Sequence, residues 1–563
     1  MTRTAVDKPL AADASYTHAA PHTTAAALPK RHEHNLPSPG GNDRGDDGHL
    51  SSSQYARRCG GLVDHLTPNI VQLNFHHPLE KWLAHPSVRR LLGVLSHGDR
   101  RGQTALQRII TSYRNPDAPL SRRMKYWLFH LFIDRMRGRT DVETFRKRLA
   151  NHAATVRGLV IVARSLSEFG LTVPQKFSAP LFAVWNFTNR CNLACKHCYQ
   201  DSERHPMDDE LALEEKLEVV DQIGRSYMPM LALSGGEPTI CPDLIPVLRR
   251  AAKYHIHITL ATNGTTMTPR LAGQLAHAGL RYVEISLDSV DPDRHDAFRG
   301  LPGMWQKAVN GAKSVVATEG LRLGVAMCVH QGNIDEVPQM IQFAEDLGAD
   351  CFAHFNFIPV GRGLKMISSD ITPEQRERLL VLLNEKMQAG GMGVISTAPQ
   401  LGRVCLAESL VDIGRTTCSH AGSGSGVKAR VVAKYLGGCG AGRTYICIEP
   451  NGNVTPCVYL PHRVMGNVRN KPLISLFRNN IFRDVLNDRS KRLHHCGVCA
   501  FRNYCGGCRA RADAYFGQLH AGDPGCTFND KHWQRLVEDG TAVANTSEAP
   551  QDMQLSPIRH GLA

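Results

Sequence analysis

The most informative absence in this chain is a long hydrophobic run. Its 563 residues contain no apolar segment of the roughly 18–20 residues that a helix needs to cross a bilayer. The first residues, Met1 to Lys8, also lack the apolar centre of a secretory signal, and the polar stretch after them supplies none. We therefore expect a soluble, cytoplasmic protein.

Acidic residues are scarce in residues 56–180. The net charge is +14, and residues 56–180 hold 21 Lys and Arg against 8 Asp and Glu, a difference of +13. Such a face can be simply solvated, hold an acidic peptide or a carboxylated substrate, lie on an anionic membrane, or bind nucleic acid. No nucleic-acid motif accompanies it, so we expect no nucleic-acid partner and keep peripheral membrane contact through 56–180 open.

Large apolar residues are rare at both ends of the chain. Residues 1–55 are rich in Ala, His, Pro, Ser, Gly and Asp, and such a segment cannot bury enough surface to offset its ordering entropy. We expect a disordered tail there and a flexible tail at 536–563. Residues 56–180 show apolar spacing suited to helices, as in Leu91–Leu95 and Tyr126–Phe132, with a further helix over about 142–169.

From residue 181 to about 395 the pattern changes to alternating short β-rich runs and helical stretches. Such alternation predicts parallel βα units, six of them, and therefore an α/β fold. The length of the chain also leaves room for about three or four domains. The expected strands are Phe182–Thr188, Met230–Ser234, His257–Ala261, Tyr282–Leu287, Leu323–Val329 and Phe352–Val360, and the expected helices are near 209–226, 243–255, 269–279, 304–318, 335–347 and 373–388.

Three cysteines follow the first expected strand. Cys191, Cys195 and Cys198 have the spacing C-x3-C-x2-C. Thiolates are the usual ligands of iron–sulfur clusters, and three of them leave one iron of a four-iron cluster open to a substrate or cofactor. A structural zinc site is the alternative. The 17 cysteines of the chain fall largely into tight groups, which is typical of metal thiolates in a reducing compartment.

Further polar motifs follow the next strands. A Gly235-Gly236-Glu237-Pro238 turn follows the second strand, Asn263 ends the third, Ser286 and Asp288 end the fourth, and Arg299 comes shortly after. Paired glycines let the backbone approach a ligand closely, and a guanidinium suits a carboxylate partner. Enzymes built on barrels of parallel strands place their catalytic groups at the carboxyl ends of those strands.

A second cysteine constellation occupies residues 396–535. Cys439 and Cys457 flank a strand-like segment and the hairpin signal Asn451-Gly452, which would bring them together. Cysteines without ligand spacing are expected to be structural. The remaining cysteines of the constellation are Cys496, Cys499, Cys505 and Cys508, in the order C-x2-C-x5-C-x2-C, and finally Cys526.

The C-x3-C-x2-C motif and the GGEP turn, in this order, resemble the radical S-adenosylmethionine (SAM) superfamily. The later cysteines resemble the SPASM extension, which binds two auxiliary 4Fe–4S clusters. The resemblance implies a partial (β/α)6 TIM-like barrel at 181–395, a C-terminal cysteine-rich iron–sulfur domain at 396–535 and an N-terminal helical extension. It implies that Cys191, Cys195 and Cys198 hold a 4Fe–4S cluster and that SAM is held by Gly235, Gly236, Glu237, Asn263, Ser286, Asp288 and Arg299.

The ligands of the auxiliary clusters are also implied by the resemblance. One cluster takes Cys496, Cys499, Cys505 and Cys526, and the other takes Cys439, Cys457 and Cys508. The fourth ligand of the second set is left open between Cys405, Cys418, another side chain and an open iron. The C-x2-C spacing at Cys505 and Cys508 departs from the common SPASM spacing and looks most like radical enzymes of haem d1 and alternative haem biosynthesis, with pyrroloquinoline quinone maturases as near relatives.

The resemblance implies an oxidoreductase that cleaves SAM reductively to a 5′-deoxyadenosyl radical and oxidatively modifies a substrate. We expect a tetrapyrrole side chain as that substrate. A ribosomal peptide or protein is the alternative, and a non-catalytic iron–sulfur electron carrier is the alternative from another class. A flavodoxin- or ferredoxin-type reductant is the expected electron source. No catalytic acid or base can be assigned from the sequence.

Overall fold

The computed structural model describes residues 78–99, 102–115, 119–137, 141–151, 153–408, 415–417 and 423–543. The tail expected at 1–55, most of the tail expected at 536–563, and Cys418 lie outside the described residues. The last described helix, α22 (Asp530–Glu538), extends past residue 536 and buries Trp533 completely.

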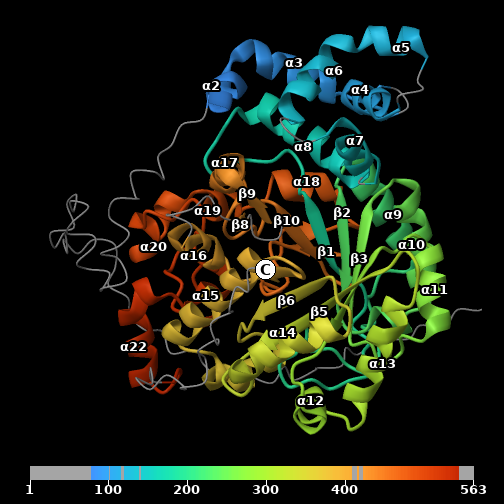
Figure 1. Cartoon of the computed structure of the whole chain (residues 1–563). Helices are drawn as coiled ribbons and strands as arrows, with labels where there is room; N and C mark the ends of the chain where they lie inside the picture. The colour runs from blue at the N-terminus through green and yellow to red at the C-terminus, as the bar shows by residue number, and fades with distance from the viewer. Residues whose placement is uncertain are drawn as a thin grey trace, which may run out of the picture.

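A ten-stranded sheet organises the molecule (Figure 1). Seven parallel strands follow one another from β1 to β7, and β10, β11 and β12 extend the sheet beyond β1. This confirms the expected α/β fold with a parallel, partial-barrel sheet. The bounds are β1 (Phe182–Asn186), β2 (Met230–Ser234), β3 (His257–Thr262), β4 (Tyr282–Ser286), β5 (Arg322–Val329), β6 (Cys351–Asn356), β7 (Gly393–Ser396), β10 (Tyr445–Ile448), β11 (Asn453–Thr455) and β12 (Gly466–Asn467), with β8 (Arg415–Thr417) and β9 (Ser423–Ser425) forming a separate pair.

Alternation along the strands decides which face receives the helices. In β2, for example, Leu231 and Leu233 are fully buried, while the alternate residues Met230, Ala232 and Ser234 are half-buried. The covering helices pack their apolar sides on these buried positions. They are α9 (Leu213–Arg225), α10 (Leu244–Lys253), α11 (Pro269–His277), α13 (Met304–Val316), α14 (Val337–Asp346) and α15 (Pro373–Ala389), and the short polar helix α12 (Pro292–Arg299) precedes α13.

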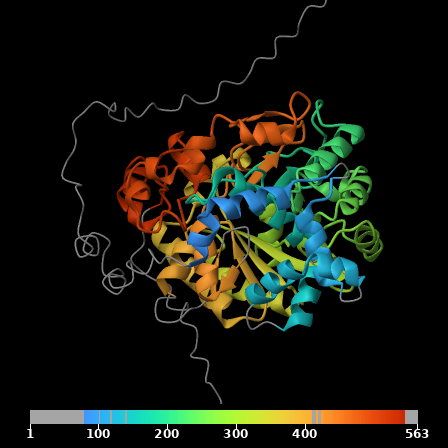
Figure 2. The same ribbon diagram turned by 90° about the horizontal axis from the view of Figure 1, so that it is seen from above.

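The basic N-terminal segment forms a set of short helices. They are α2 (Pro78–Ala84), α3 (Pro86–Ser96), α4 (Ala105–Arg114), α5 (Leu120–Lys125), α6 (Trp127–Arg137), α7 (Val142–Asn151) and α8 (Ala153–Phe169). Figure 1 shows them above the sheet, and Figure 2, turned by 90°, shows them lying across it. The single helix expected over 142–169 is two helices, α7 and α8.

Arg157 of α8 fixes where this helical segment sits on the barrel. Its guanidinium is buried and donates to the carbonyl oxygens of Gly224, Met228 and Tyr254, at 2.7, 3.1 and 3.0 Å. These carbonyls end helices or precede β2 and β3, so they mark the end of the barrel where strands begin. The basic segment therefore lies at the opposite end from the strand ends that carry the cysteine and GGEP motifs.

The C-terminal region adds short helices and the hairpin. Strand β10 pairs in parallel with β1, with Ala183 opposite Ile446, and turns at Asn451-Gly452 into β11. Gly452 has φ +83°, which is the left-handed conformation that this turn needs. The helices are α16 (Leu401–Glu408), α17 (Gly426–Leu436), α18 (Leu473–Arg478), α19 (Arg483–Asn487), α20 (His495–Val498) and α21 (Arg509–Phe516).

A buried ion network fastens the cysteine-rich region to the barrel. Arg511 of α21 pairs with Asp370 and donates to Asn356 at the end of β6, at 2.6 Å. Arg376 of α15 pairs with the other oxygen of Asp370 at 2.7 Å. All four side chains are essentially inaccessible to water. Asp523 also lies 3.6 Å from Arg511 Nε, so two carboxylates balance the two guanidiniums and the network fixes the two regions against one another.

None of the helices that the structure describes is both long and apolar enough to span a membrane.

Candidate functional site

The three cysteines of the first motif lie in a loop directly after β1. Cys191 and Cys195 are buried and Cys198 is half-buried, and all three pack in one apolar group with Met304 and Leu301. The amide of Ser202 lies 3.4 Å from the sulfur of Cys198. Amide donors of this kind suit thiolates that carry negative charge. The loop therefore gathers three thiols in a shielded place.

The GGEP turn packs directly against this loop. Gly236 donates its N–H to the carbonyl of Thr188 at 2.8 Å, and Glu237 donates to the carbonyl of Arg190 at 2.8 Å. A Cβ on Gly236 would come within 2.2 Å of the Arg190 oxygen, and Gly235 has φ +114°. Both glycines are therefore needed for the contact between the two loops.

The carboxylate of Glu237 is fully buried and engaged inside the protein. It accepts hydrogen bonds from the hydroxyls of Thr239 and Thr262, at 2.5 and 2.7 Å, and from the amide of Asn263 at 2.8 Å. Burial raises its pKa, and these donors partly oppose that shift. The side chain thus braces the end of β3 against the GGEP turn.

Asn263 connects the end of β3 to the cysteine loop. Its amide nitrogen lies 2.8 Å from the side-chain oxygen of Asn192, and the Asn192 amide in turn donates to Thr265 at 2.9 Å. Asn192 stands between Cys191 and Cys195, so this pair of amides sets the position of the cysteine loop. The first three strand ends are joined in this way.

Asp288 and Arg299 form a buried ion pair beside the cysteine loop. Arg299 Nη2 lies 2.5 Å from Asp288 Oδ2, and Nη1 lies 3.7 Å from the sulfur of Cys195. Burial alone would lower the pKa of Arg299, but Asp288 and Cys195 outweigh it and raise that pKa. Burial raises the pKa of Asp288, and Arg299 overcomes this effect so that the net shift is downward. Both groups are therefore charged at neutral pH.

Arg299 also provides a test of whether the site fits SAM. Its Nε is buried and has no hydrogen-bond partner among the residues that the structure describes. An unsatisfied buried guanidinium donor is costly, and a carboxylate is the group that would satisfy it best. The donor set next to Cys195 therefore fits the carboxylate end of SAM. Ser286, half-buried at the end of β4, stands two residues from Asp288 on the same edge.

Two features beside this loop were not identified as site residues from the sequence. Arg362 donates to the carbonyl of Cys195 at 3.0 Å and to the carbonyl of Ser202 at 2.7 Å, and so clasps the cysteine loop from the sixth strand. His197 stacks on Phe298, with ring centroids 4.3 Å apart and an interplanar angle of 3°. Burial lowers the pKa of His197 to about 3, so its ring is neutral. By resemblance to radical SAM enzymes, the sequence places Gly361-Arg362-Gly363 near the adenine end of SAM, and it does not predict this contact with the cysteine loop.

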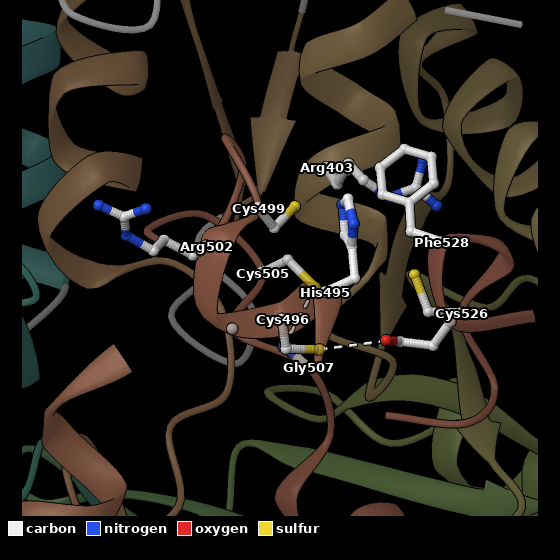
Figure 3. Close-up of a pocket in the computed structure, with 11 residues that line it drawn as sticks. Arg403, His495, Cys496, Cys499, Arg502, Cys505, Gly507, Cys526 and Phe528 are labelled. Carbon is white, nitrogen blue, oxygen red and sulfur yellow. Dashed lines mark hydrogen bonds between the residues drawn. The ribbon is translucent and has the colours of Figure 1, made fainter. Parts of the chain in front are cut away.

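Four of the later cysteines surround one cavity (Figure 3). Cys496, Cys499 and Cys505 approach it from one segment, and Cys526 faces them from another. The empty space between these side chains, including its open mouth, is about 330 Å³. The side-chain amide of Asn529 lies 3.3 Å from the Cys496 sulfur. Four buried thiols around one space fit a 4Fe–4S cluster.

Three further cysteines of the C-terminal region lie in a separate packed group. Cys457 and Cys508 are buried and Cys439 packs against them. The Cys439 amide donates to the carbonyl of Cys505 at 2.9 Å, which links this group to the four-cysteine cavity. The sequence left Cys405 open as a fourth ligand, but Cys405 packs in the main hydrophobic core.

Tyr445 is a member of this second group that the sequence did not identify. Its hydroxyl donates to the sulfur of Cys457 at 2.6 Å, and its ring stacks on Phe182 with centroids 4.9 Å apart. Cys447, two residues later, instead directs its thiol to Glu449 at 3.4 Å. The first of these contacts places a hydrogen-bond donor on a sulfur, an arrangement that tunes the potential of a cluster.

Burial governs the acidity of these thiols. It raises the pKa of Cys191, Cys457 and Cys499 to about 12. A bound metal ion reverses that effect, because a coordinating thiol is deprotonated outright. Within the described ranges no three His, Cys, Asp or Glu groups converge closely enough to hold a single metal ion. A four-iron cluster makes a different demand, since each thiolate binds its own iron.

Two family models match the chain. The radical SAM superfamily model matches residues 185–344, and the model of the iron–sulfur cluster-binding domain called SPASM matches residues 439–500. The first match contains the cysteine loop, the GGEP turn and Arg299. The second begins at Cys439 and includes Cys457, Cys496 and Cys499.

Three relatives show how far the similarity extends. An AdoMet-dependent heme synthase of Methanosarcina barkeri (strain Fusaro / DSM 804) is 30% identical over 353 residues, which is 62% of this chain and 97% of that protein. A pre-heme d1 synthase of Dinoroseobacter shibae is 30% identical and covers 64% of this chain and 88% of its own length. The mycofactocin maturase MftC of Mycobacterium tuberculosis is 28% identical, covering 65% and 86%.

The fold also matches a solved structure. Streptococcus suis SuiB superposes with a TM-score of 0.51 at 15% identity, covering 75% of this chain and 92% of that chain. At that identity the match concerns the fold alone.

Proposed function

Because this chain belongs to the radical SAM superfamily and carries the SPASM type of iron–sulfur extension, we propose that it oxidises a tetrapyrrole side chain. The chain is an enzyme, and its cofactors are 4Fe–4S clusters and SAM. When bound, these cofactors supply a 5′-deoxyadenosyl radical, which removes a hydrogen atom from the substrate. The protein's part is to position them and exclude water.

Our assignment of roles follows the strand ends. Cys191, Cys195 and Cys198 hold the cluster that meets SAM, and Arg299 pairs with the SAM carboxylate. The contacts of Arg299 with Cys195 and Asp288 carry this proposal. Through them, one guanidinium joins the cysteine loop to the carboxylate that follows β4. The remaining groups assigned to SAM are Gly235, Gly236, Glu237, Asn263, Ser286 and Asp288; for Glu237 the internal hydrogen bonds indicate a bracing role.

Auxiliary clusters give an outlet for the electron that a substrate radical must lose. We assign Cys496, Cys499, Cys505 and Cys526 to one cluster and Cys439, Cys457 and Cys508 to the other. Both sets lie next to the barrel, and the ion pair between Arg511 and Asp370 joins their region to the end of β6. A flavodoxin- or ferredoxin-type protein is the proposed reductant of the SAM-binding cluster.

The substrate class comes from the haem-forming relatives, one of which is matched over nearly its whole length. The test is anaerobic incubation with SAM, dithionite and iron porphyrins that carry carboxylated side chains. We expect 5′-deoxyadenosine to form, a porphyrin of altered mass, and deuterium in the 5′-deoxyadenosine when the side chain is deuterated. SAM cleavage without any porphyrin product or deuterium transfer would contradict the substrate class while leaving the enzyme class intact.

A radical maturase of a ribosomal peptide or protein is the second candidate. The similarity to the mycofactocin maturase favours it. Incubation with a candidate precursor peptide under the same conditions separates the two, because a modified peptide changes mass and an inert one does not. An electron carrier without catalysis is not retained, since the chain is a radical SAM enzyme.

We also propose a reducing, cytoplasmic setting. The described cysteines are all free thiols. Cluster ligands must stay reduced to bind iron, and a reducing compartment keeps them so.

A further inference from the structure

Helices α5 and α6 carry a row of apolar side chains that the described protein does not cover. Leu120, Met124, Trp127, Leu128 and Leu131 are 69, 64, 55, 63 and 55% exposed. Leu120 and Met124 are four residues apart on α5, and Trp127, Leu128 and Leu131 lie on one side of α6 at spacings of one and three residues. In a globular helix this spacing normally marks the side that faces a core. A contiguous exposed row of this kind marks an interaction surface.

The opposite side of α6 is the one that packs on the protein. Ile133 contacts the small core of Ile110, Tyr113 and Val156. Asp134 accepts a hydrogen bond from the hydroxyl of Tyr113 at 2.6 Å. These contacts fix the rotation of the helix. The exposed row is therefore a property of the folded helix rather than of one that could turn over.

The exposed charged side chains on α5 and α6 are positive. Residues 120–137 contain five Lys or Arg and a single acidic residue, Asp134. Arg123, Lys125 and Arg135 are exposed, whereas Asp134 is turned toward Tyr113. A second copy of the chain would bring like charges together on this face. A surface of negative charge with an apolar interior beneath it complements both features.

The position of the row excludes a role in binding the substrate at the mouth. The segment sits at the end of the barrel where strands begin, as the hydrogen bonds of Arg157 fix. The cysteine loop and Arg299 lie at the strand ends on the other side. Figure 1 shows α5 and α6 at the far end of the molecule from α12, which ends at Arg299. A partner held by this row leaves the mouth open.

We propose that the apolar row of α5 and α6, with its flanking Arg123, Lys125 and Arg135, docks the enzyme on the surface of an anionic phospholipid bilayer. Trp127 and the leucines would enter the boundary between headgroups and acyl chains, and the basic side chains would contact the phosphates. This is peripheral docking, separate from catalysis. It does not depend on which substrate the barrel takes.

The test is co-sedimentation of the full chain, with its clusters reconstituted, with vesicles. One set contains phosphatidylcholine alone, and in the other about one lipid in three is phosphatidylglycerol, a surface at which each basic residue strengthens binding about fivefold. We expect binding to the anionic vesicles that weakens as salt is raised, since the charge contribution is screened. Equal binding to both vesicle types, or binding to neither, overturns the proposal.

Variants separate this row from the rest of the protein. Trp127→Glu with Leu131→Glu is expected to reduce vesicle binding at least about tenfold, because two apolar anchors become charged. Ile481→Glu is the matched control, since Ile481 is 83% exposed and lies in the cysteine-rich region. Iron content and SAM cleavage should be unchanged in all variants. Unchanged binding by the double variant refutes the assignment, and so does an equal loss in the Ile481 control.

Discussion

Breaking the ion pair between Asp288 and Arg299 is the sharpest perturbation of the site. The two side chains are 1 and 9% exposed, with 2.5 Å between Nη2 and Oδ2. Removing one partner leaves the other charge buried without compensation, which costs about 3–5 kcal/mol. Arg299→Met and Asp288→Asn should each destabilise the protein by about that amount.

The double variant, Asp288→Asn with Arg299→Met, removes both charges together. The amide oxygen of the introduced asparagine can still accept the backbone N–H of Cys328, which donates to the Asp288 carboxylate at 3.0 Å. We therefore expect the double variant to be destabilised by less than the sum of the two single changes, with a coupling free energy of about 2–3 kcal/mol. Urea unfolding of all four proteins gives this cycle, and equilibrium dialysis of SAM gives the matching loss of affinity in every variant that lacks Arg299.

The pH dependence of stability gives a second test of the ion pair between Asp288 and Arg299. The pKa of Asp288 is lowered from its ordinary value of 3.8, so the stability it contributes is fully present above about pH 5 and is lost as pH falls through the lowered pKa. The stability gap between the wild type and Arg299→Met should shrink as pH falls below neutral, because burial raises the pKa of the unpaired Asp288 in the variant and the carboxyl takes up a proton there first. A gap under about 1 kcal/mol at pH 7, or one that does not change in acid, would refute the reasoning.

Three further changes test separate parts of the site. Gly236→Ala places a Cβ 2.2 Å from the Arg190 oxygen and should lower the yield of the SAM-binding cluster. Gly273→Ala is the control, because its Cβ would meet no atom within 4 Å. The iron content of the two variants is compared. Cys526→Ser should remove about four irons per chain, and Cys241→Ser should remove none; a loss in both would point to misfolding. Tyr445→Phe removes the donor to the Cys457 sulfur and should lower the potential of that centre in an EPR redox titration, while an unchanged potential would remove Tyr445 from the centre.

Local sequence patterns predicted the barrel well. The expected strands at Met230–Ser234 and Phe182–Thr188 correspond to β2 and β1, because apolar β-rich runs bounded by turn residues carry a local signal. Two elements were not expected. Strand β7 is only four residues long, and α12 is largely polar and is defined by its Asp291 cap rather than by an apolar face.

Long-range contacts carried no comparable signal. The parallel pairing of β10 with β1 joins segments more than 250 residues apart, and no sequence pattern near Ile446 predicts it. The hydroxyl of Tyr445 reaches Cys457 only because that pairing sets its direction. The sequence also could not show that the Glu237 carboxylate accepts hydrogen bonds from Thr239, Thr262 and Asn263. Motifs identify residue types, whereas the fold decides which neighbours each side chain meets.

The central claim is that this chain cleaves SAM with a cluster held by Cys191, Cys195 and Cys198 while two auxiliary clusters stand apart from it. The most direct measurement is iron and sulfide content after anaerobic reconstitution, together with 5′-deoxyadenosine formed from SAM and dithionite. We predict about twelve irons per chain, falling to about eight with complete loss of 5′-deoxyadenosine when all three cysteines are replaced by alanine. Zinc in place of iron, or SAM cleavage that survives the triple replacement, would contradict the account.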